Sequence, residues 1–306
     1  MSRFIHAQRS VTPLLALALA LATAPLSAQM GLGLSPMRLE LRFPAPASQS
    51  GSLILTNGSG DKARVRAEIL DFFLDSQETP QFGHNYEQES AFSCRSWLSV
   101  NPMETELEPG ASVMVRYTLR VPATATPRSY HCGAGFTTLP AQEQLGGTSL
   151  KTAVRVVAAF YAIVGSIPVD GTVKDVKLER TQDKDGVAGW RAVVVMDNPG
   201  LMHYRTIGDL VVMDADGKVI EKHDLSNIPV LPKRQQQLIV PLATPFTGGS
   251  YTLRARVDIG TAEIQEATVQ VFPAAVPLPA KRGNETSASP SSLVPGMPAG
   301  LMKEPK

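Results

Sequence analysis

The sequence predicts an all-β protein with two β-sandwich domains in tandem. Three observations support this fold class. Apolar and polar residues alternate with a period of two along much of the chain, turn residues separate the alternating runs, and helical periodicity is hard to find. Successive side chains of a strand point to opposite faces, so this alternation is typical of antiparallel strands that bury one face.

The first 28 residues predict a secretory signal peptide. Arg3 and Arg9 precede the apolar run Val11–Ala24, and no acidic residue occurs before residue 28. The run has about 14 residues, which is shorter than the roughly 20 that span a bilayer as a helix. We expect cleavage near Ala28, and a mature chain that is periplasmic or secreted and spans no membrane.

The predicted mature chain is nearly neutral. The full sequence has 29 basic and 28 acidic side chains, and loss of the signal peptide removes two basic ones, which leaves 27 against 28. Nucleic-acid binding depends on an excess of basic side chains that contact phosphates. We therefore expect no nucleic-acid partner.

Seven alternating runs predict seven strands in a first domain, residues 29–165. In Ser112–Val121, for example, Val113 and Val115 lie on one face and Arg116 lies on the other. Seven short strands with turns between them are typical of an immunoglobulin-like sandwich. The predicted strands are Met37–Phe43, Ser52–Thr56, Ala63–Ile69, Trp97–Val100, Ser112–Val121, Arg128–Thr138 and Leu150–Ile163.

A second immunoglobulin-like sandwich is predicted over residues 172–273, after a linker at residues 166–171. Asp216-Gly217 between two apolar runs is typical of a tight hairpin. Residues 274–306 contain six prolines and few aromatic or β-branched residues, so we expect a disordered tail. The predicted strands of this domain begin at Thr172 and continue through Trp190–Met196, Leu210–Met213, Lys218–Ile220, Gln237–Leu242, Tyr251–Ile259 and Ala262–Phe272.

Cys94 and Cys132 are the two cysteines of the chain, and we predict that they form a disulfide. An even cysteine count in an exported protein usually indicates a bridge. If Cys94 continues the strand that contains Leu98, alternation directs both sulfur atoms into one core. The bridge would then stabilise the fold by roughly 4 kcal/mol. The alternative is a pair of buried free thiols.

The sequence contains no catalytic motif and no paired-cysteine metal spacing. His131 and Cys132 are adjacent, but neighbours on a strand point to opposite faces, so we expect a solvent-exposed His131 beside a core Cys132. We expect a non-enzymatic protein with no cofactor and no metal. The polar segment Gln77–Phe92 is interpreted as a surface loop, with contact to a partner as the alternative.

Several short motifs recur at the positions where one known family has them. Over roughly residues 31–165 the chain resembles the N-terminal domain of PapD-like periplasmic pilus-assembly chaperones, and the second domain resembles an immunoglobulin-like module more loosely. The motifs are Leu32–Arg38, Trp97–Pro102 running into Leu107–Gly110, Val113–Arg116, and Phe160-Tyr161 near the end of the last strand.

The resemblance implies a partner and a binding mode. In that family, two basic residues anchor the C-terminal carboxylate of a pilus subunit, and the last strand of the first domain completes the subunit's sheet. Arg38 matches the first anchor. Ala158 stands where the family has the lysine of the second anchor, and Arg155 is the nearby basic residue, with the opposite parity. The implied partner-strand edge comprises Lys151, Ala153, Val154 and Val156.

Two functions from different classes remain open. The first is an exported chaperone or assembly factor that captures a pilin-like subunit or another secreted strand by β-strand addition. The second is a structural or adhesive cell-envelope protein that uses its immunoglobulin-like modules as spacers. For Arg38, the alternative to an anchor is a surface residue that pairs with a neighbouring acid.

Overall fold

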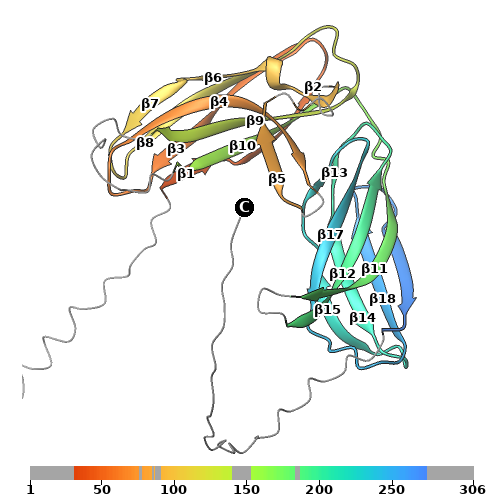
Figure 1. Ribbon diagram of the computed structural model, residues 1–306. Helices are drawn as coiled ribbons and strands as arrows, with labels where there is room; N and C mark the ends of the chain where they lie inside the picture. The colour runs from red at the N-terminus through yellow and green to blue at the C-terminus, as the bar shows by residue number, and fades with distance from the viewer. Residues whose placement is uncertain are drawn as a thin grey trace, which may run out of the picture.

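The computed structural model describes residues 31–75, 78–84, 86, 91–139, 153–182 and 187–273. Strands make up almost all of its regular structure, and they form two sandwiches set at an angle to each other (Figure 1). The predicted all-β fold with two β-sandwich domains is confirmed. The predicted signal peptide and tail lie outside the described residues, and the predicted domain limits stay predictions.

The first sheet of the first sandwich has four strands in the order β1-β3-β8-β6. Every neighbouring pair in it is antiparallel. A short 3-10 helix, η2 (Arg95–Trp97), leads into the edge strand β6. The strands are β1 (Leu32–Ser35), β3 (Ala47–Asn57), β8 (Ser112–Val121) and β6 (Leu98–Asn101).

The second sheet has the order β2-β10-β9-β4-β5, and a further strand, β7, pairs with β4. β2 runs parallel to β10, whereas the other pairs are antiparallel. The chain passes from the first sheet to the second between β1 and β2, at Pro36. The strands are β2 (Arg38–Phe43), β10 (Arg155–Val164), β9 (Arg128–Leu139), β4 (Ala63–Leu74), β5 (Pro80–Gly83) and β7 (Glu104–Leu107).

The seven strands predicted for this domain are all present, and each places apolar side chains in the core between the two sheets. Residues 150–152 of the last predicted strand lie outside the described residues. The prediction missed β1, β5 and β7, which have only four residues each and show too little alternation to be recognised. Side chains from both sheets form one buried cluster, which includes Leu53, Leu55, Val115, Leu119, Phe136, Phe160 and both cysteines.

The second sandwich has its own buried cluster, with Val194, Leu210, Leu238, Leu253 and Val257 among its members. The predicted hairpin is present, and Gly217 adopts a positive φ of 78° in its turn. Its strands form the sheets β11-β12-β17, β13-β16 and β15-β14-β18-β19. They are β11 (Thr172–Gln182), β12 (Ala188–Asn198), β13 (Tyr204–Arg205), β14 (Ile207–Met213), β15 (Val219–Asp224), β16 (Pro229–Val230), β17 (Arg234–Leu242), β18 (Tyr251–Asp258) and β19 (Gln265–Val271).

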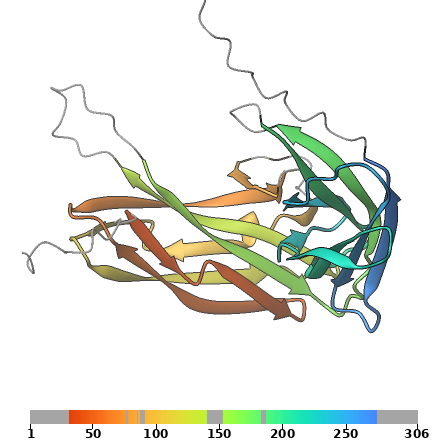
Figure 2. The same cartoon turned by 90° about the horizontal axis from the view of Figure 1, so that it is seen from below.

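The second sandwich stands at one end of the first. Viewed from below, it lies beside the end of the long strands of the first sandwich and leaves their other end clear of it (Figure 2). The contacts between the two sandwiches involve the outer face of the sheet that contains β10. This arrangement divides that sheet into a part against the second sandwich and a part away from it.

Candidate functional site

The outer edge of β10 is paired along only part of its length. β2 pairs with β10 from Ala159 to Val164. Upstream, residues 155–158 pair with β9 on one edge, and no other described strand pairs with them. We call residues 155–158 the open segment of β10 and residues 159–164 the closed segment.

Alternate residues of the open segment direct their backbone polar groups away from β9. The amide of Ala159 donates a hydrogen bond of 2.9 Å to the carbonyl of Met37, on the β2 side. Because backbone groups alternate in direction along a strand, Arg155 and Val157 direct their N–H and C=O groups to that same side. Val154 instead bonds to β9 through both of its backbone groups. The open segment therefore presents a row of strand donors and acceptors.

The predicted edge residues differ in their surroundings. Val154 and Val156 are partly buried against the core of the first sandwich. Ala158 is fully buried in that core, and Ala153 is exposed. Lys151 lies outside the described residues. Apolar side chains thus line the inner side of the open segment.

Arg38 lies where the open segment ends. It is the first residue of β2 and pairs with Ala159. Its side chain is 55% exposed, and its Nε lies 3.8 Å from Oε1 of Glu40. That distance is beyond hydrogen-bond range, so the ion pair is loose. The neighbouring acid that the sequence left open as a partner is present, but it does not hold the guanidinium group.

Arg155 lies on the same outer face as Arg38 but is directed elsewhere. It pairs with Glu68 at 3.1 Å and donates from Nε to the hydroxyl of Thr137 at 3.1 Å. Both of these partners lie on the β9 and β4 side, away from β2. Arg155 is also four residues upstream of Ala159, or about 13 Å along the strand. The structure therefore does not bring the two arginines together.

An ion-pair network joins Glu40 of β2 to the second sandwich. The Nε of Arg205 donates to Oε1 of Glu40 at 3.1 Å, and Nε2 of His203 lies 4.0 Å from the same oxygen. The interaction with His203 lowers the pKa of Glu40 to about 2 against the opposing effect of burial, and Arg205 adds to the lowering. Glu40 is therefore ionised at neutral pH.

Aromatic and apolar residues also contact one another at the interface between the two sandwiches. His203 stacks on Tyr161 of β10, with ring centroids 4.5 Å apart, and Ser129 Oγ lies 2.5 Å from its Nδ1. Tyr161, Phe72 and Leu231 form a small buried cluster between the sandwiches. These contacts cover the outer face of the closed segment.

The segment Gln77–Phe92 is not simply a surface loop, which corrects the prediction. It contains β5, and the hairpin before that strand reaches the second sandwich. The carboxylate of Glu78 accepts the backbone amide of Ile239 at 2.5 Å, and Gln236 donates to the carbonyl of Asp75 at 2.9 Å. Contact with the second domain of the same chain explains the polar side chains at this turn.

His131 also differs from its prediction. It is only 1% exposed, whereas the sequence predicted a solvent-exposed residue. Alternation did direct it away from Cys132, but that outer face is covered by Phe72, whose ring centroid lies 5.0 Å from the imidazole. The residue that covers this face belongs to β4 of the same sandwich, so alternation gave the face of His131 correctly but not its burial.

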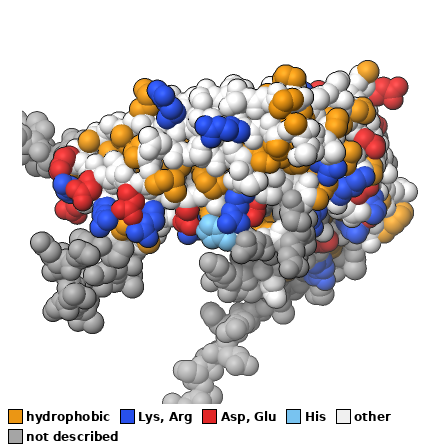
Figure 3. Space-filling model, turned by 90° about the horizontal axis from the view of Figure 1, so that it is seen from above, with side chains coloured by type: hydrophobic (Ala, Val, Ile, Leu, Met, Phe, Trp, Pro, Cys, Tyr) orange, Lys and Arg blue, Asp and Glu red, His pale blue; other side chains and the backbone are white. Residues whose placement is uncertain are grey.

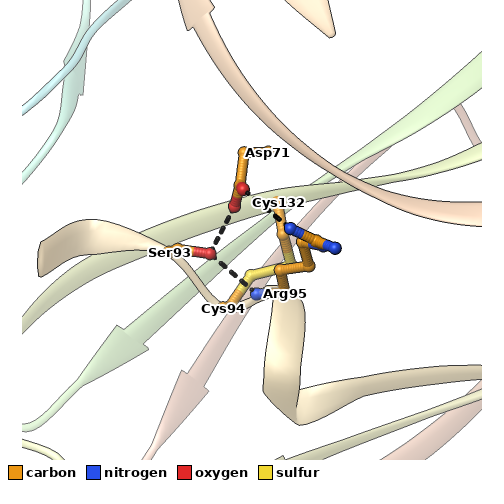
Figure 4. The surroundings of a disulfide bond; sticks show 5 residues. All are labelled: Asp71, Ser93, Cys94, Arg95 and Cys132. Carbon is orange, nitrogen blue, oxygen red and sulfur yellow. Dashed lines mark hydrogen bonds and ion pairs between the residues drawn. A yellow bond between two sulfur atoms is a disulfide. The ribbon is translucent and has the colours of Figure 1, made fainter. Parts of the chain in front are cut away.

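The predicted disulfide between Cys94 and Cys132 is present, with Cα atoms 5.2 Å apart (Figure 4). Cys94 precedes η2 and does not continue β6, so the strand assumed for it was wrong although the pairing was right. Beside the bridge, Ser93 donates to Asp71 at 2.5 Å and accepts the amide of Arg95 at 3.1 Å. These bonds fix the segment that carries Cys94.

A cavity of about 800 Å³ opens beside β4. Its lining includes Glu68, Asp71, His84, Arg95 and Met103. Both carboxylates are engaged, since Glu68 pairs with His84 at 3.1 Å and Asp71 pairs with Arg95 at 3.5 Å. The two carboxylates of this cavity thus form ion pairs with other residues of its own lining.

Surface charge on the first sandwich is mixed. Viewed from above, basic and acidic side chains are interspersed with scattered hydrophobic ones (Figure 3). This face therefore presents no broad basic surface of the kind that binds phosphates. Among the described residues, no helix has the length and apolar character to cross a membrane.

Comparisons with known proteins found similarity only at the level of structure. No family model matches the sequence, and no curated protein matches it. The solved Class 5 fimbriae chaperone CfaA is 12% identical, with a TM-score of 0.41, over 81% of this chain and 100% of its own. The E. coli chaperone DraB is 16% identical, with a TM-score of 0.38, over 77% of this chain and 96% of its own.

A third similar structure is a complex. It is the CsuC-CsuE chaperone-tip adhesion subunit pre-assembly complex from the archaic chaperone-usher Csu pili of Acinetobacter baumannii, with 10% identity and a TM-score of 0.40. The match covers 78% of this chain and 97% of that one. Likeness at this level carries no argument about function.

Proposed function

We propose that this chain is an exported chaperone or assembly factor that captures an extended partner strand by β-strand addition. The observation that carries the proposal is the open segment of β10, which ends at an exposed arginine. Unpaired N–H and C=O groups along a strand edge form hydrogen bonds readily with another chain. Val157 and Arg155 supply these groups.

The position of Arg38 favours one direction for the partner strand. β2 runs parallel to β10 and begins at Arg38. A partner strand that lies along the open segment, parallel to β10, therefore ends with its C-terminal carboxylate beside the Arg38 guanidinium. An antiparallel strand would bring its N-terminal ammonium group there and would be repelled. Charge thus selects a parallel strand with a free C-terminus.

The side chains beside the edge favour an apolar partner strand. Val154 and Val156 are partly buried against the first core, directly next to the open segment. Alternate side chains of an added strand would lie beside them and extend that core. We expect a captured strand with alternating aliphatic residues, as a pilin-like subunit with an incomplete sheet would offer.

The export signal and the motif resemblance support the setting of this activity. A predicted signal peptide directs the chain to the periplasm or the exterior, where pilus subunits fold. The motifs between residues 32 and 161 resemble those of PapD-like chaperones, whose partners are such subunits. The activity requires no cofactor, because main-chain hydrogen bonds and apolar burial supply the binding energy.

The spacer function keeps one observation in its favour, namely the contacts that fix the two sandwiches. Glu78 and Arg205 each form hydrogen bonds across the interface. A rigid spacer would use such contacts without binding a strand. It would remain monomeric and would not copurify with a fibre subunit.

Arg38→Ala tests the proposal in the mature full chain. The probe is a synthetic peptide of alternating aliphatic residues with a free C-terminal carboxylate, and its C-terminal amide is the matched probe. We expect the wild type to prefer the carboxylate peptide by about tenfold, or about 1.4 kcal/mol, in fluorescence anisotropy. Arg38→Ala should abolish the preference.

Arg42→Ala is the control for this experiment. Arg42 is exposed on the same strand and on the same face as Arg38, but it lies opposite Ile163, beyond the open segment. Its substitution should leave the preference for the carboxylate unchanged. If neither peptide binds the wild type, or if Arg38→Ala retains the full preference, the proposal is wrong.

A further inference from the structure

The carboxylate of Glu40, which is charged at neutral pH, lies beside Arg38, the proposed anchor. Glu40 is two residues from Arg38 on β2, so both side chains project from the same face with Cα atoms about 6.6 Å apart. The carboxyl of Glu40 is ionised, because its pKa is lowered to about 2. Glu40 can therefore compete with the carboxylate of a partner for the guanidinium of Arg38.

Arg205 engages Glu40 more closely than Arg38 does. Both guanidinium groups approach the same atom, Oε1 of Glu40, but the distance from Nε is 3.1 Å for Arg205 and 3.8 Å for Arg38. Only the former lies in hydrogen-bond range. Glu40 is thus bonded to the second sandwich rather than to its neighbour on β2.

The side chain of Arg205 is also the more buried of the two and has more partners. It is 18% exposed, against 55% for Arg38. It donates to the carbonyl of Asn227 at 3.0 Å, and its guanidinium carbon lies 5.6 Å from the ring centroid of Tyr161. A guanidinium held on several sides loses little further entropy when it binds a carboxylate.

His203 contributes to the low pKa of Glu40, but its contact with the carboxylate is longer than that of Arg205. Its Nε2 lies 4.0 Å from the carboxylate, and burial lowers its pKa, so the imidazole is mainly neutral at neutral pH. Arginine remains charged at every physiological pH. Arg205 therefore supplies the lasting positive charge that holds Glu40.

We propose that Arg205 is a positioning residue for strand capture: it holds Glu40 away from Arg38, so that Arg38 stays available for the C-terminal carboxylate of the partner. This inference rests on the proposed function. It assigns the second sandwich a part in capture that requires no contact with the partner. The coupling is reciprocal, so capture of a carboxylate should also strengthen the contact between Arg205 and Glu40.

A set of three variants tests the inference with the carboxylate and amide peptides. Arg205→Gln should weaken binding of the carboxylate peptide by about fivefold or more, because Glu40 then pairs with Arg38. Binding of the amide peptide should not change. Glu40→Gln should retain or strengthen binding of the carboxylate peptide. The double variant should recover the wild-type affinity, because the competing charge is gone.

The recovery in the double variant separates positioning from a merely structural role. If Arg205→Gln acts only by loosening the interface, both peptides lose affinity and Glu40→Gln does not restore it, which overturns the inference. Arg256→Gln is the control, since Arg256 pairs with Glu266 on the far sheet of the second sandwich. It should leave both affinities unchanged.

The outcomes also separate the inference from the function on which it rests. Loss of carboxylate preference in Arg38→Ala with no effect of Arg205→Gln overturns the inference and leaves the proposed function intact. Lack of binding by the wild type overturns the function itself. If Arg205→Gln does not fold, Glu40→Gln alone still decides, because weaker binding of the carboxylate peptide in that variant contradicts competition.

Discussion

The two segments of β10 have similar sequences but different neighbours. Both consist largely of alanine and β-branched residues, and both pair with β9. The closed segment also pairs with β2, and both of its faces are covered, by the first core at Phe160 and by the second sandwich at Tyr161. Among the described strands only β9 pairs with the open segment, and Arg155 at its start is exposed.

We therefore assign stability mainly to the closed segment of β10 and binding to the open segment. A strand fixed on both edges and both faces contributes most of its burial to folding. The adjoining open segment continues the same backbone, so its free donors and acceptors are held in the extended conformation before a partner arrives. Such preorganisation reduces the entropy that a captured strand must lose on binding.

The largest expected effect concerns the closed segment. Phe160 is fully buried and lies edge to face with Tyr117, at 5.0 Å between ring centroids. Phe160→Ala should lower the free energy of unfolding by about 3–5 kcal/mol, because it removes a large buried ring and leaves a cavity. Urea unfolding of the mature chain, followed by circular dichroism, measures this loss.

Val157→Pro, in the open segment, is the counterpart of Phe160→Ala in the closed segment. The N–H of Val157 points to the unpaired edge, so proline removes a donor that no described strand uses. The free energy of unfolding should change by about 1 kcal/mol or less, while binding of the apolar peptide should be lost. Equal destabilisation by both variants would contradict the division between the segments.

A smaller effect is expected from loss of the disulfide, which lies in the same core cluster as Phe160 of the closed segment. Cys132 pairs with Phe160 in the ladder between β9 and β10. Replacing Cys94 and Cys132 together with alanine should cost about 2–4 kcal/mol of stability, mainly through greater freedom of the unfolded chain. Chemical unfolding of the double variant and of the oxidised wild type, which keeps the bridge, measures the cost.

The folded double variant also tests whether the open segment of β10 depends on the disulfide. Peptide binding at the open segment should then be unchanged, because neither sulfur atom lies at the unpaired edge. A loss of peptide binding without a loss of stability would indicate that the bridge shapes the open segment directly.

Alternation predicted much of this architecture. Strands such as β2 and β8 bury one row of side chains, so a period of two identified them and placed Arg38 off the core face. The two sulfur atoms were expected in one core, and they are there. The local structure around Cys94 was nevertheless wrong, because a three-residue 3-10 helix leaves no periodic signal.

The interface could not be predicted in the same way. Periodicity shows which residues share a face, but not what covers that face. Glu40 lies on the outer face of the first sandwich, and its partners Arg205 and His203 come from the second. The ring over His131 comes from Phe72 of β4, which is distant from it in the chain. Glu40 and Arg205 are 165 residues apart in the chain, and no local pattern connects them. The partner-strand edge at Lys151, Ala153, Val154 and Val156 was expected only through a family resemblance, and it stays a prediction.

The smallest expected effect is a loosening of the interface in acid. The pKa of Glu40 in the folded chain, about 2, lies below its ordinary value of 4.5, so its stabilising contribution is present above pH 4.5 and is lost as the pH falls toward 2. Burial also lowers the pKa of His203 below 6.5, so protonation places a charge on a buried ring and costs stability as the pH falls below about 6.5. An exposed pair of this kind contributes about 1 kcal/mol or less.

Small-angle X-ray scattering between pH 7 and pH 2.5 measures this loosening as an increase in the radius of gyration. Glu40→Gln should remove the part of the increase that occurs below pH 4.5 and should leave the part that begins near pH 6.5. If the variant and the wild type expand identically below pH 4.5, Glu40 does not hold the second sandwich against the closed segment. Coverage of that segment would then depend on Tyr161, Phe72 and Leu231, whose contacts do not titrate in this range.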